Sequence, residues 1–249
     1  MDTTREAKVR VSNFTKCYGD LLVLDNINFN IAKGEMLSIV GPTGCGKTTF
    51  LNCMSKLTET SAGNIYIDGE PADPRKHNLS FVFQEPSAMP WRTVSQNVAY
   101  GMELKKFSKE KQEERLNYML DLVGLTDTAQ LYPNQVSASM MQRIAVARAF
   151  AVNPDLLLMD EPYGQLDVKL RFYLEDELVK LWQELQSTVL FVTHNIEEAV
   201  YVAQRILVLT PKPTSIKEEV IVDLPYPRDI RDPKFIAIRR YVTELIRWW

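Results

Sequence analysis

The sequence is poor in the side chains that most often bind transition metals, with two histidines and three cysteines among 249 residues. Cys17, Cys45 and Cys53 are an odd number without the spacing of a zinc motif, so we expect free thiols and no zinc site. A basic surplus is also missing, because 29 Lys and Arg stand against 32 Asp and Glu. The resulting net charge of −3 argues against a nucleic-acid partner.

Long apolar runs are absent as well. No segment reaches the roughly 18–20 apolar residues that a membrane-spanning helix needs, and residues 1–6 contain no apolar signal region. We therefore expect a cytosolic protein. The hydrophobic fraction of 45% is that of an ordinary globular protein.

Strand-like and helix-like patterns alternate along most of the chain. Strand patterns occupy residues 9–19, 27–31, 36–40, 64–69, 80–84, 156–159, 189–193, 205–209 and 220–222. Helical spacing follows at residues 48–57, 109–123, 137–151, 168–185 and 233–247. These patterns predict one α/β domain over residues 1–249, with a mostly parallel sheet and an N-terminal antiparallel β fringe. A helical subdomain is expected at about 86–152 and a C-terminal helix at 233–247.

A phosphate-binding motif lies between the apolar run at 36–40 and the helix that follows it. Residues 41–48 fit Gly-x-x-x-x-Gly-Lys-Ser/Thr completely, which predicts the core of a P-loop NTPase. Glycines let the backbone wrap around phosphate, and the helix N-terminus adds partial positive charge. The predicted nucleotide-binding residues here are Gly41, Pro42, Thr43, Gly44, Cys45, Gly46, Lys47, Thr48 and Thr49. A glycine turn that only joins strand to helix is the alternative.

Three further polar residues follow buried strands and point to ATP chemistry. Asp160 and Glu161 end the run at 156–159, and His194 follows the run at 189–193. Carboxyl ends of parallel strands line the ligand crevice of an open α/β sheet. We therefore expect Lys47 to bind the β- and γ-phosphates, and Thr48 and Asp160 to bind Mg²⁺. Glu161 is the candidate base for the attacking water, and His194 a donor to the γ-phosphate.

Together these residues resemble the ATPase subunits of ABC transporters over essentially the whole chain. By this resemblance, Tyr18 matches the aromatic residue that stacks on adenine, and Gln84 matches a glutamine that contacts Mg²⁺ and the permease. Glu161 resembles the family's catalytic glutamate, and His194 its switch histidine. Leu166 and Asp167 resemble its D-loop. The resemblance implies ATP and Mg²⁺ as cofactors and membrane permease subunits as partners.

A narrower resemblance points to importers of nitrate, sulfonate, taurine or bicarbonate. It rests on residues 83–86, 90–94, 97–98 and 224–228, followed by 232–233 and the C-terminal helix. It implies a solute-binding protein in the same system and a peripheral position on the cytoplasmic face of the inner membrane. Trp91, in a predicted loop after Gln84, suits a surface for a partner, although a role in the local core is the alternative.

The signature segment departs from the family pattern. Where the family has Leu-Ser-Gly-Gly, this chain has Val136, Ser137, Ala138 and Ser139, of which the last three are the expected contacts to a partner's ATP. Other departures are Met141 in place of Arg, Gln165 in place of Ala and Asn195 in place of Asp. Any position of the signature that needs φ > 0 would be strained by roughly 1 kcal/mol or more. We therefore expect a heterodimer with a second ATPase subunit rather than a homodimer.

Two other functions fit parts of the sequence. A nucleotide-binding regulatory subunit with little turnover would explain the altered signature, but the retained Glu161 and His194 argue against it. A soluble ABC-type ATPase acting on ribosomes or DNA usually has paired ATPase domains or a long coiled-coil insertion, and this chain has neither. Measured ATPase activity and co-purification with a membrane subunit separate the three functions.

Overall fold

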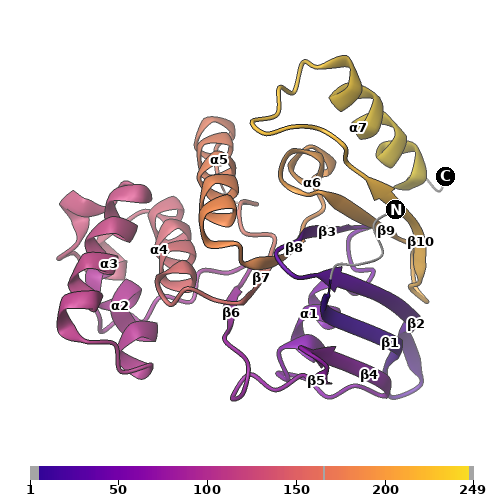
Figure 1. Cartoon of the computed structure of the whole chain (residues 1–249), viewed down its shortest axis with the longest axis horizontal. Coiled ribbons are helices and arrows are strands. Elements are labelled where there is room, and N and C mark those ends of the chain that lie inside the picture. The colour runs from indigo at the N-terminus through magenta and orange to yellow at the C-terminus, as the bar shows by residue number, and fades with distance from the viewer. Residues whose placement is uncertain (1–5, 165, 247–249) are drawn as a thin grey trace.

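A six-stranded sheet runs between two groups of elements in the computed structural model, which describes residues 6–164 and 166–246 (Figure 1). Gln165 and Arg247 therefore lie outside the described residues. The strands lie in the order β10 (Ile216–Ile221), β9 (Arg205–Leu209), β3 (Met36–Val40), β8 (Thr188–Val192), β7 (Leu156–Asp160) and β6 (Leu79–Val82). All neighbouring strands are parallel except β10 and β9. The predicted mostly parallel sheet is confirmed.

The middle strands bring the candidate site together. Every residue of β3, β7 and β8 is buried, which explains their nearly unbroken apolar sequences. Their register aligns Ile39 with Val192, and Val192 with Asp160, so the carboxyl ends of the three strands lie side by side. The P-loop, Glu161 and His194 therefore all begin at one edge of the sheet.

Each face of this sheet packs against its own hydrophobic core. Met36 and Val40 contribute to one core, whereas Leu37 and Ile39 alternate with them and contribute to the other. The helices around the sheet are α1 (Lys47–Met54), α5 (Val168–Leu185), α6 (Ile196–Val202) and α7 (Pro233–Ile246). Helix α1 belongs to the second core, and α5, α6 and α7 belong to the first.

A second, antiparallel sheet covers α1 and confirms the predicted N-terminal β fringe. Its strands lie in the order β2 (Leu21–Ala32), β1 (Ala7–Tyr18), β4 (Ala62–Ile67) and β5 (Glu70–Pro71). Phe14 of β1 packs edge-on against Phe50 of α1, with ring centroids 5.3 Å apart. The β1–β2 hairpin places Tyr18 beside the P-loop cavity.

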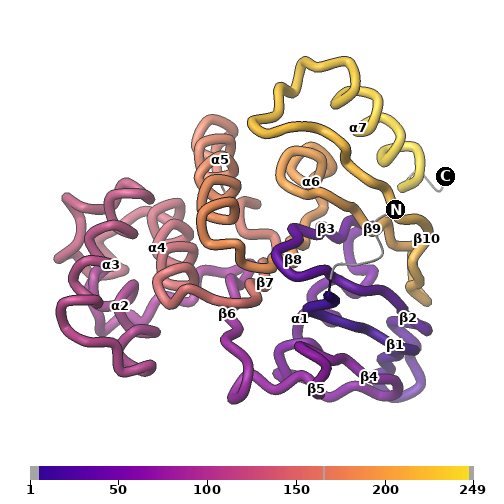
Figure 2. Tube along the Cα trace, viewed as in Figure 1, coloured from indigo at the N-terminus to yellow at the C-terminus, as the bar shows by residue number. Residues whose placement is uncertain are grey.

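Three helices form a group at the far side of the sheet from β1 and β2 (Figure 1). They are α2 (Val94–Leu104), α3 (Lys109–Leu122) and α4 (Ala138–Ala151), with short 3₁₀ turns at Thr126–Thr128 and Pro133–Gln135. The chain enters this group from β6 and returns from α4 to β7 (Figure 2). The helices lie within the predicted subdomain, whose boundaries at 86 and 152 stay a prediction.

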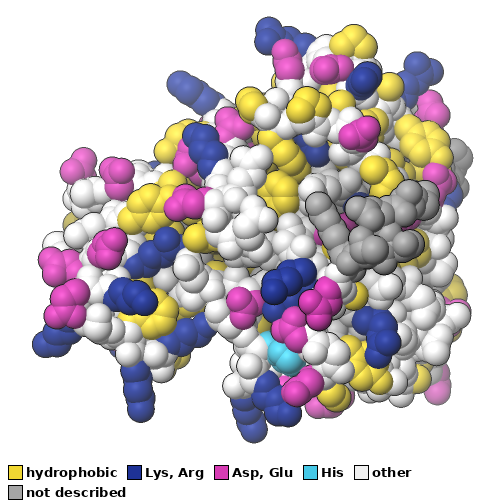
Figure 3. Space-filling model, viewed as in Figure 1, with side chains coloured by type: hydrophobic (Ala, Val, Ile, Leu, Met, Phe, Trp, Pro, Cys, Tyr) yellow, Lys and Arg dark blue, Asp and Glu magenta, His cyan; other side chains and the backbone are white. Residues whose placement is uncertain are grey.

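The surface mixes charges of both signs, as the small net charge requires (Figure 3). Among the described residues, no helix has the length and apolar character needed to cross a bilayer. The three cysteines are free thiols, as the sequence predicted.

Candidate functional site

The P-loop joins the end of β3 to the first turn of α1 in a conformation that needs glycine. Gly46 has φ +114°, and a Cβ there would lie 2.9 Å from Cγ1 of Val23. At Gly41 the constraint is space alone, because a Cβ would lie 2.9 Å from Cβ of Leu209. The packing of β2 and β9 around the loop therefore fixes these two glycines.

Lys47 opens α1 and folds back over the loop that precedes it. Its ammonium group donates hydrogen bonds to the carbonyls of Gly41, at 2.9 Å, and Pro42, at 3.2 Å. From the other side, the Thr214 hydroxyl donates to the carbonyl of Cys45 at 2.5 Å. Burial raises the pKa of the Cys45 thiol. The loop is thus held in shape by groups on both sides.

A cavity of about 710 Å³ opens above the P-loop. It brings together residues that are distant in the sequence: Tyr18, Leu21, Val23, Thr43, Gly44, Gly46, Lys47, Thr48, Thr49, Gln84, Glu161, His194 and Lys212. Most of the predicted nucleotide residues of the P-loop therefore share one cavity with Tyr18, Glu161 and His194. Gly41, Pro42 and Cys45 contribute to it by shaping the loop rather than by lining the cavity.

Sequence reasoning missed three residues of this cavity. Leu21 and Val23 follow Tyr18 in the same hairpin, so their nearness to the predicted adenine-stacking residue was the available signal. Lys212 comes from the loop between β9 and β10 and adds a second cation to the cavity that Lys47 lines. Its position has no spacing relation to the P-loop motif, so no sequence pattern pointed to it.

Asp160 lies behind the cavity as the last residue of β7 and is 2% exposed. Burial raises the pKa of this carboxyl; a hydrogen bond from Thr48 and the charge of Lys47 oppose the effect, whereas Glu161 adds to it. Its Oδ1 atom has no hydrogen-bond partner. A buried carboxylate oxygen without a partner, next to a hydroxyl, is a donor set that suits a divalent cation.

Glu161 is held by contacts from two other strand ends. Its backbone has φ +46°, and its amide donates to the carbonyl of Val192 at 2.8 Å. The Oε2 atom lies 2.9 Å from Nδ1 of His194 and accepts a hydrogen bond from Nε2 of Gln84 at 3.2 Å. Because an ionised carboxylate only accepts hydrogen bonds, Nδ1 of His194 carries the proton in this contact.

The signature residues do not line the cavity of their own chain. Ser137 is the N-cap of α4, and its hydroxyl accepts a hydrogen bond from the amide of Met140 at 3.2 Å. Ala138 and Ser139 occupy the first turn of the helix and neither has a positive φ. The condition for backbone strain is therefore not met at these positions, because the segment is ordinary right-handed helix. What the substitutions change is the side chains at this helix start.

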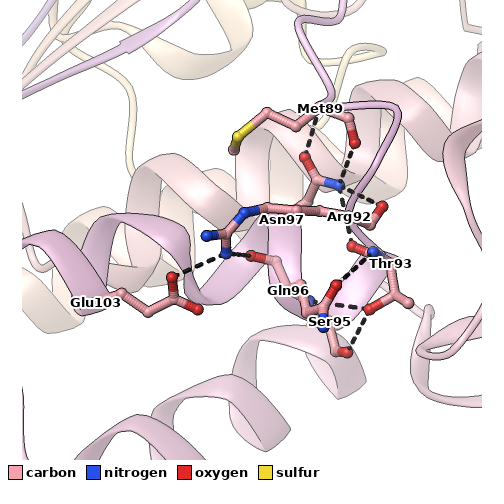
Figure 4. Close-up of polar contacts among 7 residues, drawn as sticks. All are labelled: Met89, Arg92, Thr93, Ser95, Gln96, Asn97 and Glu103. Atoms are coloured by element: carbon pink, nitrogen blue, oxygen red, sulfur yellow. Dashed lines mark hydrogen bonds and ion pairs between the residues drawn. The ribbon is translucent and has the colours of Figure 1, made fainter.

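Trp91 lies on a loop that a buried amide holds in place. Its side chain is 73% exposed, which rules out a role in the local core. Asn97 is fully buried and accepts from the amide of Met89 at 2.8 Å. The Asn97 amide also donates to the carbonyls of Met89, Arg92 and Thr93 at 3.0–3.1 Å (Figure 4). A reciprocal capping box between Thr93 and Gln96 starts α2 directly after this loop.

Comparisons with known proteins agree with this geometry. The family model for ABC transporters matches residues 24–164. The chain is 39% identical to an aliphatic sulfonates import ATP-binding protein of Bacillus cereus, over 93% of this chain and 91% of that protein. It is 37% identical to a nitrate import ATP-binding protein of Synechocystis, over 92% of this chain and 90% of that one.

Solved structures give the same answer. A dimeric bacterial ABC transporter cassette is 33% identical, with a TM-score of 0.79, over 87% of this chain and all of that one. Another structure of similar likeness is a post-hydrolysis state bound to ADP and phosphate. The chain therefore belongs to the ABC transporter family, as an ATP-binding and hydrolysing subunit.

Proposed function

We propose that this subunit powers the import of a small anion, such as nitrate, a sulfonate, taurine or bicarbonate, through a separate permease. The observation that carries the proposal is the cavity that joins the P-loop to Glu161 and His194 in a chain similar to sulfonate and nitrate import subunits. A permease and a solute-binding protein complete the system, with this subunit on the cytoplasmic face of the membrane.

The binding half of the reaction uses residues from four elements. Tyr18 offers its ring to adenine at one end of the cavity, while the P-loop amides and Lys47 bind the phosphates. Thr48, Asp160 and Gln84 would hold Mg²⁺, which supplies charge neutralisation to the phosphate oxygens when bound. The unpartnered Oδ1 of Asp160 supports this assignment.

The hydrolytic half uses Glu161 and His194. Contacts at Oε2 from Gln84 and His194 fix the Glu161 carboxylate at the edge of the cavity, where it orients a water for attack. Since Nδ1 of His194 donates to Glu161, the ring can donate to a phosphate only from Nε2. That second donation requires a protonated ring or a ring that has released Glu161.

The experiment compares two variants with the wild-type subunit. Lys47→Ala should abolish productive ATP binding, because the triphosphate loses its buried cation. Glu161→Gln should bind ATP but not turn it over, because the amide cannot take the proton from water. Equilibrium binding of a fluorescent ATP analogue and phosphate release measure the two steps. Steady-state hydrolysis by Glu161→Gln at the wild-type rate would show that Glu161 does not activate the attacking water.

The altered signature supports pairing with a different ATPase subunit. Ser137, Ala138 and Ser139 stand at the start of α4, outside their own cavity, where they are available to a partner's ATP. The Cβ atoms of Ala138 and Ser139 occupy space that glycines leave open. One site of the heterodimer would then combine this chain's cavity with an intact signature, and the other would mainly hold ATP. Two copies of this chain in the purified transporter, with both sites hydrolysing equally, would refute the heterodimer.

A regulatory subunit with little turnover is the second candidate, and the same altered signature favours it. The two candidate functions predict different effects of Glu161→Gln on transport. A regulatory subunit tolerates Glu161→Gln in the assembled transporter without loss of transport, whereas a working ATPase does not.

A further inference from the structure

A buried ionic group links the His194 loop to the turn that opens α5. Glu198 lies on α6 and is 4% exposed, and its carboxylate contacts residues on both sides of His194. The Thr193 hydroxyl donates to Oε2 of Glu198 at 2.6 Å. The side-chain amide of Asn195 donates to Oε1 at 3.1 Å. The two residues that flank His194 are thus both hydrogen-bonded to one carboxylate.

The same carboxylate pairs with a cation from the neighbouring helix. Nε of Arg171 lies 3.3 Å from Oε1 of Glu198, as an ion pair without the alignment of a hydrogen bond. Nη2 of Arg171 donates to the carbonyl of Leu166 at 3.4 Å, just before Asp167 caps α5. Helices α5 and α6 pack side by side at this point (Figure 1). The ion pair between Arg171 and Glu198 therefore connects two segments. One is the loop that holds His194, and the other is the turn at Leu166 that resembles the D-loop.

This arrangement gives a physical reason for Asn195, at a position where the family usually has Asp. Its amide nitrogen donates to Glu198, while its Oδ1 caps α6 by accepting from the amide of Glu197 at 2.9 Å. An aspartate could provide the cap but not the donor, and it would set a second negative charge against Glu198. The amide thus satisfies both the helix start and the buried carboxylate.

We propose that Glu198 and Arg171 are positioning residues, which hold His194 against Glu161 and tie its loop to the turn before α5. Neither residue lines the nucleotide cavity. Their effect on hydrolysis passes through the 2.9 Å contact between Nδ1 of His194 and Oε2 of Glu161. The inference rests on the proposed role of His194, but the position of the ring can be measured without any catalysis.

The scarcity of histidine makes that measurement direct. Only His77 and His194 contribute imidazole signals, so spectra of the full-length subunit hold the signals of two rings, and the variant His77→Gln assigns them. In nucleotide-free Glu198→Gln we expect the His194 resonance to shift while that of His77 stays in place. Glu197→Gln is the matched control, because Glu197 pairs with Arg239 of α7 through its side chain. A His194 resonance identical to wild type in Glu198→Gln would overturn the proposal.

Kinetics separate positioning from a general loss of structure. Glu198→Gln should lower kcat for ATP hydrolysis about tenfold or more, because small misplacements of catalytic groups are costly. KM and the dissociation constant for ATP should change less than twofold, since the cavity lining is intact. The double variant Glu198→Gln with Arg171→Met should be no slower than Glu198→Gln alone. Independent, multiplicative losses would contradict a single ionic link.

Two further variants keep the proposal testable if Glu198→Gln does not fold or if His194 has no role in hydrolysis. If Glu198→Gln does not fold, Arg171→Lys replaces it, because lysine keeps the charge but cannot reach Leu166 and Glu198 with a planar fork. If His194→Ala hydrolyses ATP at the wild-type rate, the proposed role of His194 fails. In that case a shifted His194 signal in Glu198→Gln, together with an unshifted one in Glu197→Gln, still supports the positioning of the ring by Glu198.

Discussion

Lys212 shows how a single residue can add to a binding site that a motif already defines. It comes from the β9–β10 loop and lies outside the residues that the family model matches, yet it lines the cavity with Lys47. Thr214, two residues further along the chain, is fully buried and donates a hydrogen bond to the P-loop backbone, so the loop is fastened to the site. A second cation near the phosphates favours a polyanionic ligand.

The first prediction is that Lys212→Met weakens ATP binding by about three- to tenfold, which corresponds to roughly 1 kcal/mol. The salt dependence of binding should fall, because one screened attraction is gone. Lys33→Met is the control, since Lys33 stands before β3, at the opposite end of the strand that leads into the P-loop. Titration of a fluorescent ATP analogue at two salt concentrations measures both effects. Unchanged affinity in Lys212→Met would show that the loop contributes shape alone.

Glu175 gives the second prediction at this scale. It is 1% exposed with no hydrogen-bond partner at either carboxyl oxygen, and burial, with the charge of Glu198, raises its pKa to about 9. The folded state therefore keeps a proton that the unfolded chain loses above its ordinary pKa of 4.5. The contribution of Glu175 to stability should then fall as the pH rises from about 4.5 towards 9, by at most about 1.4 kcal/mol per pH unit.

Glu175→Gln should remove this pH dependence, because the amide mimics the protonated carboxyl. Urea unfolding at pH 6 and pH 8 should show the variant gaining stability over wild type at the higher pH. Glu114→Gln, an exposed carboxylate on α3, serves as the control. Parallel changes in wild type and Glu175→Gln would mean that Glu175 is not protonated in the folded chain.

At the scale of elements, α2 illustrates how polar groups can prepare a surface. The Asn97 side chain and the capping box hold the chain at the start of α2 (Figure 4). Trp91 lies on the loop just before it and is exposed. An exposed tryptophan on a held loop is a preorganised contact for a partner, because little entropy is lost when it binds. The loop directly follows Gln84, a residue of the nucleotide cavity.

The third prediction distinguishes the role of Trp91 as a contact for a partner from the role of Asn97 in holding the loop. Trp91→Ala should change the free energy of unfolding by less than about 0.5 kcal/mol, since the side chain is exposed. It should leave ATP binding intact but reduce solute-stimulated hydrolysis in the assembled transporter. Asn97→Ala should cost roughly 1–3 kcal/mol, because buried backbone groups lose their partner. Faster amide exchange at Met89 should accompany it. A Trp91→Ala subunit that unfolds on its own would remove the support for a partner surface.

Elements also show where the sequence was sufficient. The strands β3, β7 and β8 were predictable because continuous apolar runs ended in polar motifs, and helix 168–185 has its predicted bounds. Helix α1 ends at Met54 instead of residue 57, because Lys56 adopts φ +59°. Helices α2 and α6 were not predicted individually. The first buries a polar Asn97 within its apolar face, and the second has only seven residues.

The candidate site was less predictable at its margins than at its centre. Lys47, Glu161 and His194 follow strands whose parallel order brings their ends together, so motif and topology agreed. The contacts of Glu198 and Arg171 depend on how α5 and α6 pack, and neither residue belongs to a recognisable spacing. The backbone at Ala138 and Ser139 could not be inferred either, because a helix start and a left-handed turn both accept the glycines of the usual signature.

The whole molecule keeps its nucleotide cavity and its signature on separate elements, so we expect a complete site to need two chains. The cavity lies at the carboxyl ends of β3, β7 and β8. The signature starts α4, which belongs to the helical group (Figure 1). A related cassette of known structure is dimeric. Substitutions in the signature should therefore act on the partner's ATP and leave nucleotide binding to the isolated chain unchanged.

The last prediction uses this separation to test whether Ala138 and Ser139 limit turnover. The double substitution Ala138→Gly and Ser139→Gly should destabilise the subunit by about 1 kcal/mol, because glycine is unfavourable in a helix. It should nevertheless speed ATP hydrolysis by copies of this chain alone, because the helix start can then approach a partner's phosphates more closely. Thermal unfolding and phosphate release give the two opposite effects, and Lys109→Gly with Glu110→Gly, at the equivalent exposed first turn of α3, controls for lost helix stability. A variant that is less stable and no faster would mean that the side chains of the signature are not the obstacle, and the argument for a heterodimer would lose its physical basis.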